Sequence, residues 1–327
     1  VGVHIKIKRD LTRVTGANIS IRVTDEFMDA VQSEKDVELR WPVDSEDPTV
    51  SVHDNASEIW HEIIEGAHAS AEPGVLFWDT AKRMTPSDVY EDEGFGSVST
   101  NPCGEIILSP YDSCRLMLMN LSSFVKDAWT PEATFDYGDF ARKTFYAQRL
   151  MDDMIDLEIE QVDKILTKIE NDPESQEVKQ IELDLWENVK TRAILGRRTG
   201  LGITGLGDML AMLGIKYGSK EAIAETEEVY KWLSINSYES SIVLAKERGS
   251  FGAWDYEKEK NHPFISGVIG ELLPHRQEDY KKHGRRNIAN TTTAPAGSVS
   301  VLTQTTSGIE PAFMLHYTRR KKLTGQD

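Results

Sequence analysis

The stretch from Ser99 to Cys114 brings a thiol, a carboxylate and an amide together within a few positions. Asn101, Cys103 and Glu105 stand at i, i+2 and i+4, so on an extended segment their side chains point the same way. A thiol supports one-electron or nucleophilic chemistry, a carboxylate moves protons, and an amide orients a polar substrate group. The spacing predicts a site that acts on one small molecule. The alternative interpretation is a buried structural cysteine beside a turn, because free cysteine is among the most buried residue types.

A second candidate site lies between residues 287 and 300. This segment contains three consecutive threonines, an Ala-Pro-Ala-Gly turn sequence and two serines. An extended entry, small turn residues, and Gly and Ser at an expected helix start would expose backbone N–H groups and hydroxyls without bulky side chains. The pattern is compatible with a phosphate cradle, and also with an ordinary loop between a strand and a helix.

Two further patterns have the residue types of metal ligands but are interpreted as ordinary helix residues. His61 and His68 each follow a Glu by three positions, as in di-iron proteins, but both pairs lie on one expected helix, and a di-iron site needs facing helices. The acidic run at 152–160 contains no histidine, so we interpret it as a solvated charged face. The sequence therefore predicts no metal site. The carboxylates of the acidic run are Asp152, Asp153, Asp156, Glu158 and Glu160.

The run from Gly200 to Gly205 matches the dinucleotide-binding pattern G-x-G-x-x-G. That pattern has meaning only between a strand and a helix, whereas residues 188–198 before it are typical of the end of a helix. We interpret the run as a glycine-rich strand that other backbone approaches closely.

Composition narrows the class of protein. The chain has 327 residues, a net charge of −17 and two cysteines. Its length suffices for one large α/β domain or two smaller ones. The negative charge argues against binding to nucleic-acid backbones, and no apolar run is long enough to predict a membrane span. Two cysteines in so long a chain are not a disulfide scaffold, and we expect a cytoplasmic protein.

Apolar periodicity predicts alternating strands and helices in the first hundred residues. A strand at 18–23 precedes a helix capped by Thr24, and the polar region 35–55 is expected to form a surface excursion with a small hairpin. Another strand is predicted at 73–78, and a loop at 85–96.

The motif that contains Cys103 is expected on a strand at 99–108. An apolar run from Cys114 to Leu121 could return and pair with that strand, which would bring Cys114 near Cys103.

The second half is mostly helical by the same criteria. Residues 139–190 and 221–248 are expected to be helical, the latter helix ending at Gly249, and residues 312–315 are expected to form a last strand.

Four parts of the sequence together resemble the catalytic subunit of ribonucleotide reductase, over nearly the whole chain. Asn-x-Cys-x-Glu is the active-site motif of that family, and it occurs here in order with the other parts. The resemblance implies an α/β fold, namely part of a ten-stranded α/β barrel of the ribonucleotide reductase and glycyl radical type, with the motif on a finger loop. Residues 1–327 would form the central portion of one catalytic barrel domain, cut at both ends, without the first strands, the effector site and the C-terminal tail. The parts are Asn101–Glu105, Asn18–Phe27, Arg197–Gly218, and Thr292–Ser298 with Ser307–Pro311.

The resemblance also implies roles for single residues. Cys103 would be the thiyl radical that abstracts the ribose 3′ hydrogen, Glu105 the base for the 3′ hydroxyl, and Asn101 a hydrogen-bonding group for the substrate. Cys114 resembles one of the two cysteines that deliver reducing equivalents as the 2′ hydroxyl leaves as water. In the family, the second of these cysteines lies before the point where this chain begins. The substrate diphosphate would rest on Ala296, Gly297, Ser298 and Val299.

The form of the motif, Asn-Pro-Cys-Gly-Glu followed by Tyr-Asp-Ser-Cys-Arg, resembles the adenosylcobalamin-dependent class of the family. This implies reduction of ribonucleotides with adenosylcobalamin and a dithiol reductant such as thioredoxin. The alternative is the di-metal class, in which a separate subunit generates the radical. The complete enzyme is expected to be a homodimer that binds a ribonucleotide and neither nucleic acid nor membrane, and this chain is expected to be inactive by itself. A nonenzymatic module that holds nucleotides or a partner subunit is the remaining alternative.

Overall fold

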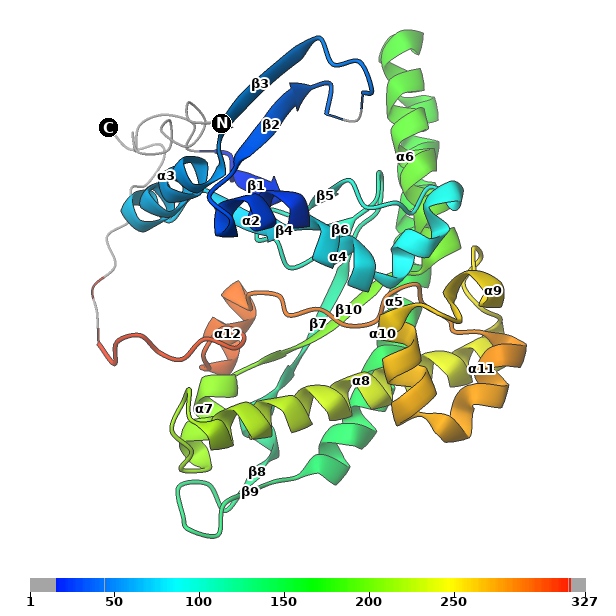
Figure 1. Cartoon of the computed structure of the whole chain (residues 1–327). Coiled ribbons are helices and arrows are strands. Elements are labelled where there is room, and N and C mark those ends of the chain that lie inside the picture. The colour runs from blue at the N-terminus through cyan, green and yellow to red at the C-terminus, as the bar shows by residue number, and fades with distance from the viewer. Residues whose placement is uncertain (1–15, 44, 317, 319–327) are drawn as a thin grey trace. The chain divides into compact units, whose positions relative to one another are not determined.

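The structure is a computed structural model that describes residues 16–43, 45–316 and 318. The chain divides into two compact units (Figure 1). Unit 1 comprises Val1–Pro110 and Glu257–Ser266, and unit 2 comprises Tyr111–Tyr256 and Gly267–Asp327. Helices and strands are mixed in both units, and the strands of the described residues pair two by two.

Unit 1 is built on two short parallel strands with helices packed against them. Its elements are β1 (Ser20–Val23), α2 (Asp25–Gln32), β2 (Asp36–Trp41), β3 (Val50–Asn55), α3 (Ala56–Ser70), β4 (Gly74–Phe77), α4 (Trp78–Met84), the 3₁₀-helix η1 (Pro86–Glu93), β5 (Ser99–Thr100), β6 (Ile107–Leu108) and α10 (Pro263–Ile265). β1 pairs with β4 in parallel, and β2 and β3 form the expected small hairpin. Thr24 caps α2 as expected, since its hydroxyl accepts the N–H of Phe27 at 3.1 Å. Ile59 and Ile63 of α3 form a small apolar core against β1, β2 and β4.

Unit 2 contains the longest helices and a second parallel sheet. Its elements are β7 (Arg115–Asn120), the 3₁₀-helix η2 (Leu121–Phe124), β8 (Val125–Lys126), β9 (Thr134–Phe135), α5 (Tyr137–Asn171), α6 (Gln176–Gly196), β10 (Thr199–Thr204), α7 (Leu206–Met212), α8 (Lys220–Arg248), the 3₁₀-helix η4 (Pro274–Arg276), α11 (Gln277–His283) and α12 (Gly297–Thr303). The chain passes between the units at α9 (Tyr256–Glu259) and at the π-helix η3 (Ser266–Leu272).

β10 is the central strand of the sheet in unit 2. β7 pairs with it in parallel, and along its other edge runs the extended segment 289–292. The N–H of Leu201 donates to the carbonyl of Asn290 at 2.8 Å, and the carbonyl of Leu201 accepts the N–H of Thr292 at 3.0 Å. Every residue of β10 is buried as a result. The prediction of a glycine-rich strand closely approached by other backbone is confirmed.

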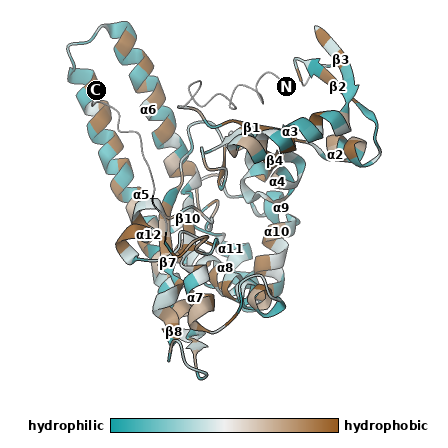
Figure 2. Ribbon diagram, turned by 90° about the vertical axis from the view of Figure 1, so that its left-hand side faces the viewer, coloured by the Kyte–Doolittle hydropathy of each residue, from teal (hydrophilic) through white to brown (hydrophobic). Residues whose placement is uncertain are grey.

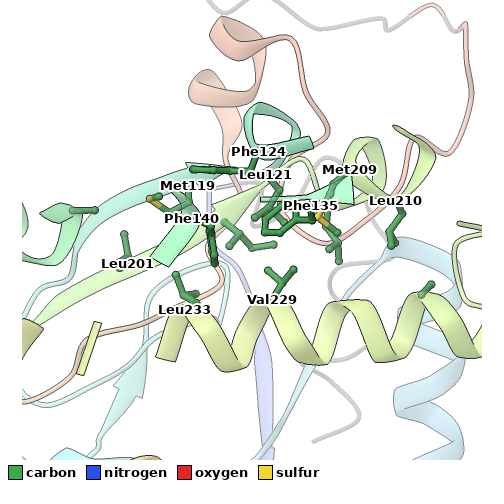
Figure 3. Packing of buried hydrophobic residues seen from close by; sticks show 14 of the residues in the cluster. Met119, Leu121, Phe124, Phe135, Phe140, Leu201, Met209, Leu210, Val229 and Leu233 are labelled. Atoms are coloured by element: carbon green, nitrogen blue, oxygen red, sulfur yellow. The ribbon is translucent and has the colours of Figure 1, made fainter. Parts of the chain in front are cut away.

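The core of unit 2 lies between this sheet and α8. Val229 and Leu233 point from α8 toward Leu201 of β10 and Phe140 of α5 (Figure 3). All four side chains are completely buried. Because burying one such side chain contributes about 1.5–3 kcal/mol, this cluster fixes the sheet against its helices.

The region expected to be helical from 139 to 190 forms two helices, α5 and α6, which lie side by side (Figure 2). Pro173 separates them, because the residue before a proline is disfavoured in helical conformation. Ser175 then caps α6, its hydroxyl accepting the N–H of Val178 at 3.4 Å. The long helix expected at 221–248 is confirmed as α8.

Three local expectations were wrong. Residues 85–96 contain the 3₁₀-helix η1, which begins with a proline, a residue favoured at the first helical position. Residues 312–315 are irregular and exposed, and they belong to none of the strands assigned within the described ranges. β7 pairs with β10 rather than with residues 99–108, which close on themselves as a hairpin of β5 and β6.

Within the described ranges, none of the helices combines the length and the apolar character that crossing a membrane requires.

Candidate active site

The residues of the first motif lie in the turn of a hairpin in unit 1. β5 and β6 pair antiparallel, and residues 101–106 connect them. The backbone carbonyl of Asn101 accepts the N–H of Gly104 at 3.0 Å, and its side-chain Oδ1 accepts the N–H of Ile106 at 3.2 Å. The expectation that the amide, the thiol and the carboxylate share one face of an extended strand is therefore wrong.

The local sequence explains this turn. Asn, Pro and Gly occupy the first, second and fourth positions of Asn-Pro-Cys-Gly, where β-turns prefer them. Gly104 has a φ of +82°, a conformation that glycine adopts at no steric cost. A signal for the turn was thus present in the sequence. Residues at i, i+2 and i+4 share a face only in an extended chain, whereas residues 101–106 form a turn.

The turn exposes Cys103, while Asn101 and Glu105 are half-buried. Cys103 is therefore not a buried structural cysteine. The carbonyl of Pro102, next to the thiol-bearing residue, accepts a hydrogen bond from Nδ2 of Asn18 at 2.8 Å. Asn18 precedes β1 and anchors the turn, a role that sequence analysis missed because the two residues are 84 positions apart.

Cys114 is half-buried in unit 2, immediately before β7, and its Sγ lies 3.8 Å from the carbonyl oxygen of Arg115. Two ion pairs hold this end of the strand. Nε of Arg198 donates to Oδ2 of Asp112 at 2.6 Å, and Nη2 of Arg115 donates to Oε1 of Glu158 at 2.7 Å. Glu158 is thus tied to the sheet, and its assignment to a solvated face was wrong.

The residues predicted to hold phosphate form the start of α12. Ala296 is the buried N-cap residue, and Gly297, Ser298 and Val299 are exposed in the first turn. The first N–H groups of a helix have no acceptor within the helix. A Cβ placed on Gly297 would meet no atom within 4 Å, so the backbone at this position is open.

The acidic run on α5 is partly buried, contrary to expectation. Asp152 is completely buried, with Oδ1 2.7 Å from Nε of Arg197 and Oδ2 3.3 Å from Nη1 of Arg248. Arg197 also pairs with Asp156 at 2.8 Å, and Arg248 also pairs with Asp153 at 2.6 Å. The carboxylates of Asp152, Asp153 and Asp156 lie close enough together to hold a cation. In this structure the guanidinium groups of Arg197 and Arg248 provide the positive charge beside them. The arginines lie on other elements, so the sequence pattern of α5 alone could not predict the burial.

The structure thus has an exposed thiol in a hairpin turn and a second, half-buried thiol beside a parallel sheet, within a mixed α/β fold. The family model described as "Ribonucleotide reductase, barrel domain" matches residues 3–326. The chain belongs to the ribonucleotide reductase barrel-domain family, and the resemblance drawn from its motifs is confirmed.

Several relatives carry names that specify the class. The chain is 33% identical over 95% of its length to a vitamin B12-dependent ribonucleoside-diphosphate reductase of Thermoplasma acidophilum, and covers 33% of that protein. It is 31% identical over 92% of its length to the protein of the same name from Mycobacterium tuberculosis, and covers 36% of it. The chain thus spans about a third of the length of these relatives.

A solved structure has the same fold. The class Id ribonucleotide reductase alpha subunit of Actinobacillus ureae matches with a TM-score of 0.56 and 20% identity, over 90% of this chain and 43% of that chain.

Proposed function

We propose that the protein reduces ribonucleotides to 2′-deoxyribonucleotides by a cysteine thiyl radical mechanism. Residues 1–327 would be the central portion of one catalytic domain, a ten-stranded α/β barrel. The single observation that supports this best is the exposed thiol of Cys103 in a turn that also contains Asn101 and Glu105. One family model covers both units, which supports their assignment to one catalytic domain.

Each side chain has one task in this proposal. Cys103, as a thiyl radical, would take the hydrogen atom from C3′ of the ribose and return it to C3′ at the end of the cycle, which restores the thiyl radical. Glu105 would accept the proton of the 3′ hydroxyl. Oδ1 of Asn101 is engaged inside the turn, so its amide nitrogen would donate to the substrate. The exposed start of α12, at residues 296–299, would bind the diphosphate.

Cys114 would act in the reductive step. It and a second thiol give up two electrons and two protons and become a disulfide, while the 2′ hydroxyl leaves as water and a hydrogen takes its place at C2′. The sequence contains only Cys103 and Cys114, so the second reducing thiol would come from outside these 327 residues. A thioredoxin-like dithiol would then reduce the disulfide, in the cytoplasm, where thiols are kept reduced. The family resemblance further suggests a homodimer.

The proposed cofactor is adenosylcobalamin, as the names of the relatives suggest. A large cofactor needs open access to the sulfur that becomes the radical, and the exposed position of Cys103 fits this requirement. When bound, adenosylcobalamin supplies the radical by homolysis of its cobalt–carbon bond. Cys103 is the residue of this chain that would receive it.

Two substitutions in the complete protein test the assignment of the cysteines. Cys103→Ser should abolish all chemistry, because an alcohol O–H is much harder to convert to a radical than a thiol S–H. Cys114→Ser should retain exchange of the 3′ hydrogen or release of the base, yet form no deoxynucleotide. Product analysis with a labelled ribonucleotide, adenosylcobalamin, effector and dithiol distinguishes the two outcomes. Equal loss of every signal in both variants would refute the division of roles.

The same assay decides between the classes. Activity with adenosylcobalamin and a dithiol as the only additions besides effector supports the proposal. Activity that ignores cobalamin and requires a metal-containing partner subunit would place the protein in the di-metal class. No reduction under either condition would favour a nonenzymatic nucleotide-binding or partner-binding module.

A further inference from the structure

The two faces of β10 differ sharply. Leu201 and Ile203 belong to the apolar core that includes Val229 of α8. Gly200 and Gly202 alternate with them and so point to the opposite face. On the face turned away from the core, β10 therefore has no side chain at positions 200 and 202.

Atoms of β7, of Cys114 just before it and of the segment 289–292 occupy the space above the two glycines. A Cβ placed on Gly200 would lie 2.3 Å from Sγ of Cys114, 2.8 Å from Cγ2 of Thr292 and 3.1 Å from Cδ2 of Leu116. A Cβ on Gly202 would instead lie 2.3 Å from the backbone oxygen of Thr292. Only the first of these two glycines makes room for sulfur.

We infer that Gly200 is a positioning residue, which gives the Cys114 thiol its place on the sheet. Non-bonded heavy atoms are in favourable contact at about 3.5–4.0 Å, so any side chain at position 200 would push the sulfur away by more than about 1 Å. Thr292 and Leu116 lie against the same point and restrict where the sulfur could go. The catalytic significance of this inference rests on the proposed function, in which Cys114 is one of the two reducing thiols.

The chemistry explains why such a displacement matters. When the two thiols become a disulfide, their sulfur atoms must come within bonding distance of about 2.05 Å, with a defined dihedral angle. A misplacement of about 1 Å in a reacting group can reduce a rate by about 10²-fold. Gly200→Ala should therefore reduce deoxynucleotide formation by about that factor and retain the exchange of the 3′ hydrogen that depends on Cys103.

A double-mutant cycle tests the contact without relying on activity. Gly200→Ala should lower the urea midpoint of unfolding, and adding Cys114→Ala should restore a substantial part of that shift, because it removes the sulfur that the new methyl group meets. Gly202→Ala is the matched control, on the same strand and the same face. Its shift in midpoint should be the same with Cys or Ala at position 114. Equal shifts for Gly200→Ala in both backgrounds would refute the inference.

A second measurement separates positioning from general damage to the strand. In the complete protein with Cys103→Ser, the rate at which Cys114 is alkylated can be followed on the peptide that contains it by mass spectrometry. Gly200→Ala should change that rate by at least tenfold relative to Gly200. An unchanged rate would refute the displacement of the sulfur. If the complete protein reduces no ribonucleotide, the proposed function is refuted. The unfolding cycle and the alkylation rate do not depend on activity, so they test the contact between Gly200 and Cys114 whether or not the protein is a reductase.

Discussion

Replacing Asp152 by asparagine removes the negative charge at the centre of a buried network in unit 2. Oδ1 of Asp152 accepts hydrogen bonds from Arg197 at 2.7 Å and from Asn287 at 3.1 Å. Oδ2 accepts from Arg286 at 3.2 Å and from Arg248 at 3.3 Å. Through Arg197 the network joins α5 to the start of β10, and through Arg286 it joins α5 to the segment that leads into 289–292. Loss of the network should therefore weaken the sheet beside which Cys114 lies.

The expected loss is large. Asp152→Asn keeps the shape of the side chain but replaces one acceptor oxygen with an NH₂ group that faces guanidinium donors. Breaking a buried ion pair by removing one partner typically costs about 3–5 kcal/mol, and we expect a loss of that size in the free energy of unfolding. Folded domains are stable by only about 5–15 kcal/mol, so the variant should have a much lower urea midpoint.

The control is the same substitution at an exposed position of the same helix. Asp163 pairs with Lys190, and their side chains are 52% and 31% exposed. Asp163→Asn should cost less than about 1 kcal/mol, as is typical of surface ion pairs. Urea unfolding of both variants, followed by far-UV circular dichroism, gives the comparison. If Asp152→Asn costs no more than Asp163→Asn, the buried network around Asp152 does not stabilise unit 2 as proposed.

The pH dependence provides an independent check. Burial by itself would raise the pKa of Asp152, but the hydrogen bonds and charges of Arg197 and Arg286 outweigh burial and hold this pKa below its usual value. A carboxyl whose pKa is lower in the folded state stabilises that state fully above its unfolded pKa of about 3.9 and loses this effect as the pH falls through the folded pKa. The difference in stability between the wild type and Asp152→Asn should stay constant near neutral pH and narrow below about pH 4. A difference that instead widens on acidification would contradict this assignment.

Three further substitutions have defined expected outcomes. Gly104→Ala places an L-residue at a φ of +82° and should lower the free energy of unfolding, measured in urea, by about 1–2 kcal/mol. The new Cβ would lie 3.7 Å from Cδ2 of Leu76, so the cost comes from the backbone and not from a clash. An unchanged midpoint would mean that the turn relaxes freely. Asn18→Ala removes the hydrogen bond to Pro102 and should speed proteolysis within the turn with little change in global stability; identical cleavage rates would exclude an anchoring role. Leu201→Ala, in the fully buried core, should cost about 2–5 kcal/mol in urea unfolding, and a loss below 1 kcal/mol would argue against the packing around β10.

Features with a local cause could be predicted from the sequence. Thr24 caps α2 through a hydroxyl three residues from its partner, and α8 ends at Gly249 because glycine readily takes the conformation that ends a helix. The glycine-rich run was correctly assigned to a strand because the residues before it are helical. The order of the motifs along the chain was sufficient to identify the family.

The geometry of the candidate site required more than local pattern. The turn that presents Cys103 has a sequence signature in Asn-Pro-Cys-Gly, but its anchor, Asn18, lies 84 residues away. The environment of Cys114 depends on β10 as the partner of β7, and no pattern within either strand specifies that pairing. Gly200 faces this thiol because Leu201 and Ile203, which alternate with the glycines of β10, face the core beside α8.

The sequence by itself determined the family and most helices and pointed to the candidate catalytic residues. Each motif, cap or apolar period is contained in a short segment, and the order of such segments along the chain is visible without the fold. Only the tertiary structure decided which strands pair, where the thiol of Cys114 lies, and that Asp152 is buried. Arg197 and Arg286, which make this burial tolerable, are 45 and 134 residues away from it. A strand partner or a counter-ion at such distances is chosen by the packing of the whole core, to which many residues contribute small energies, and no short segment of sequence contains that information.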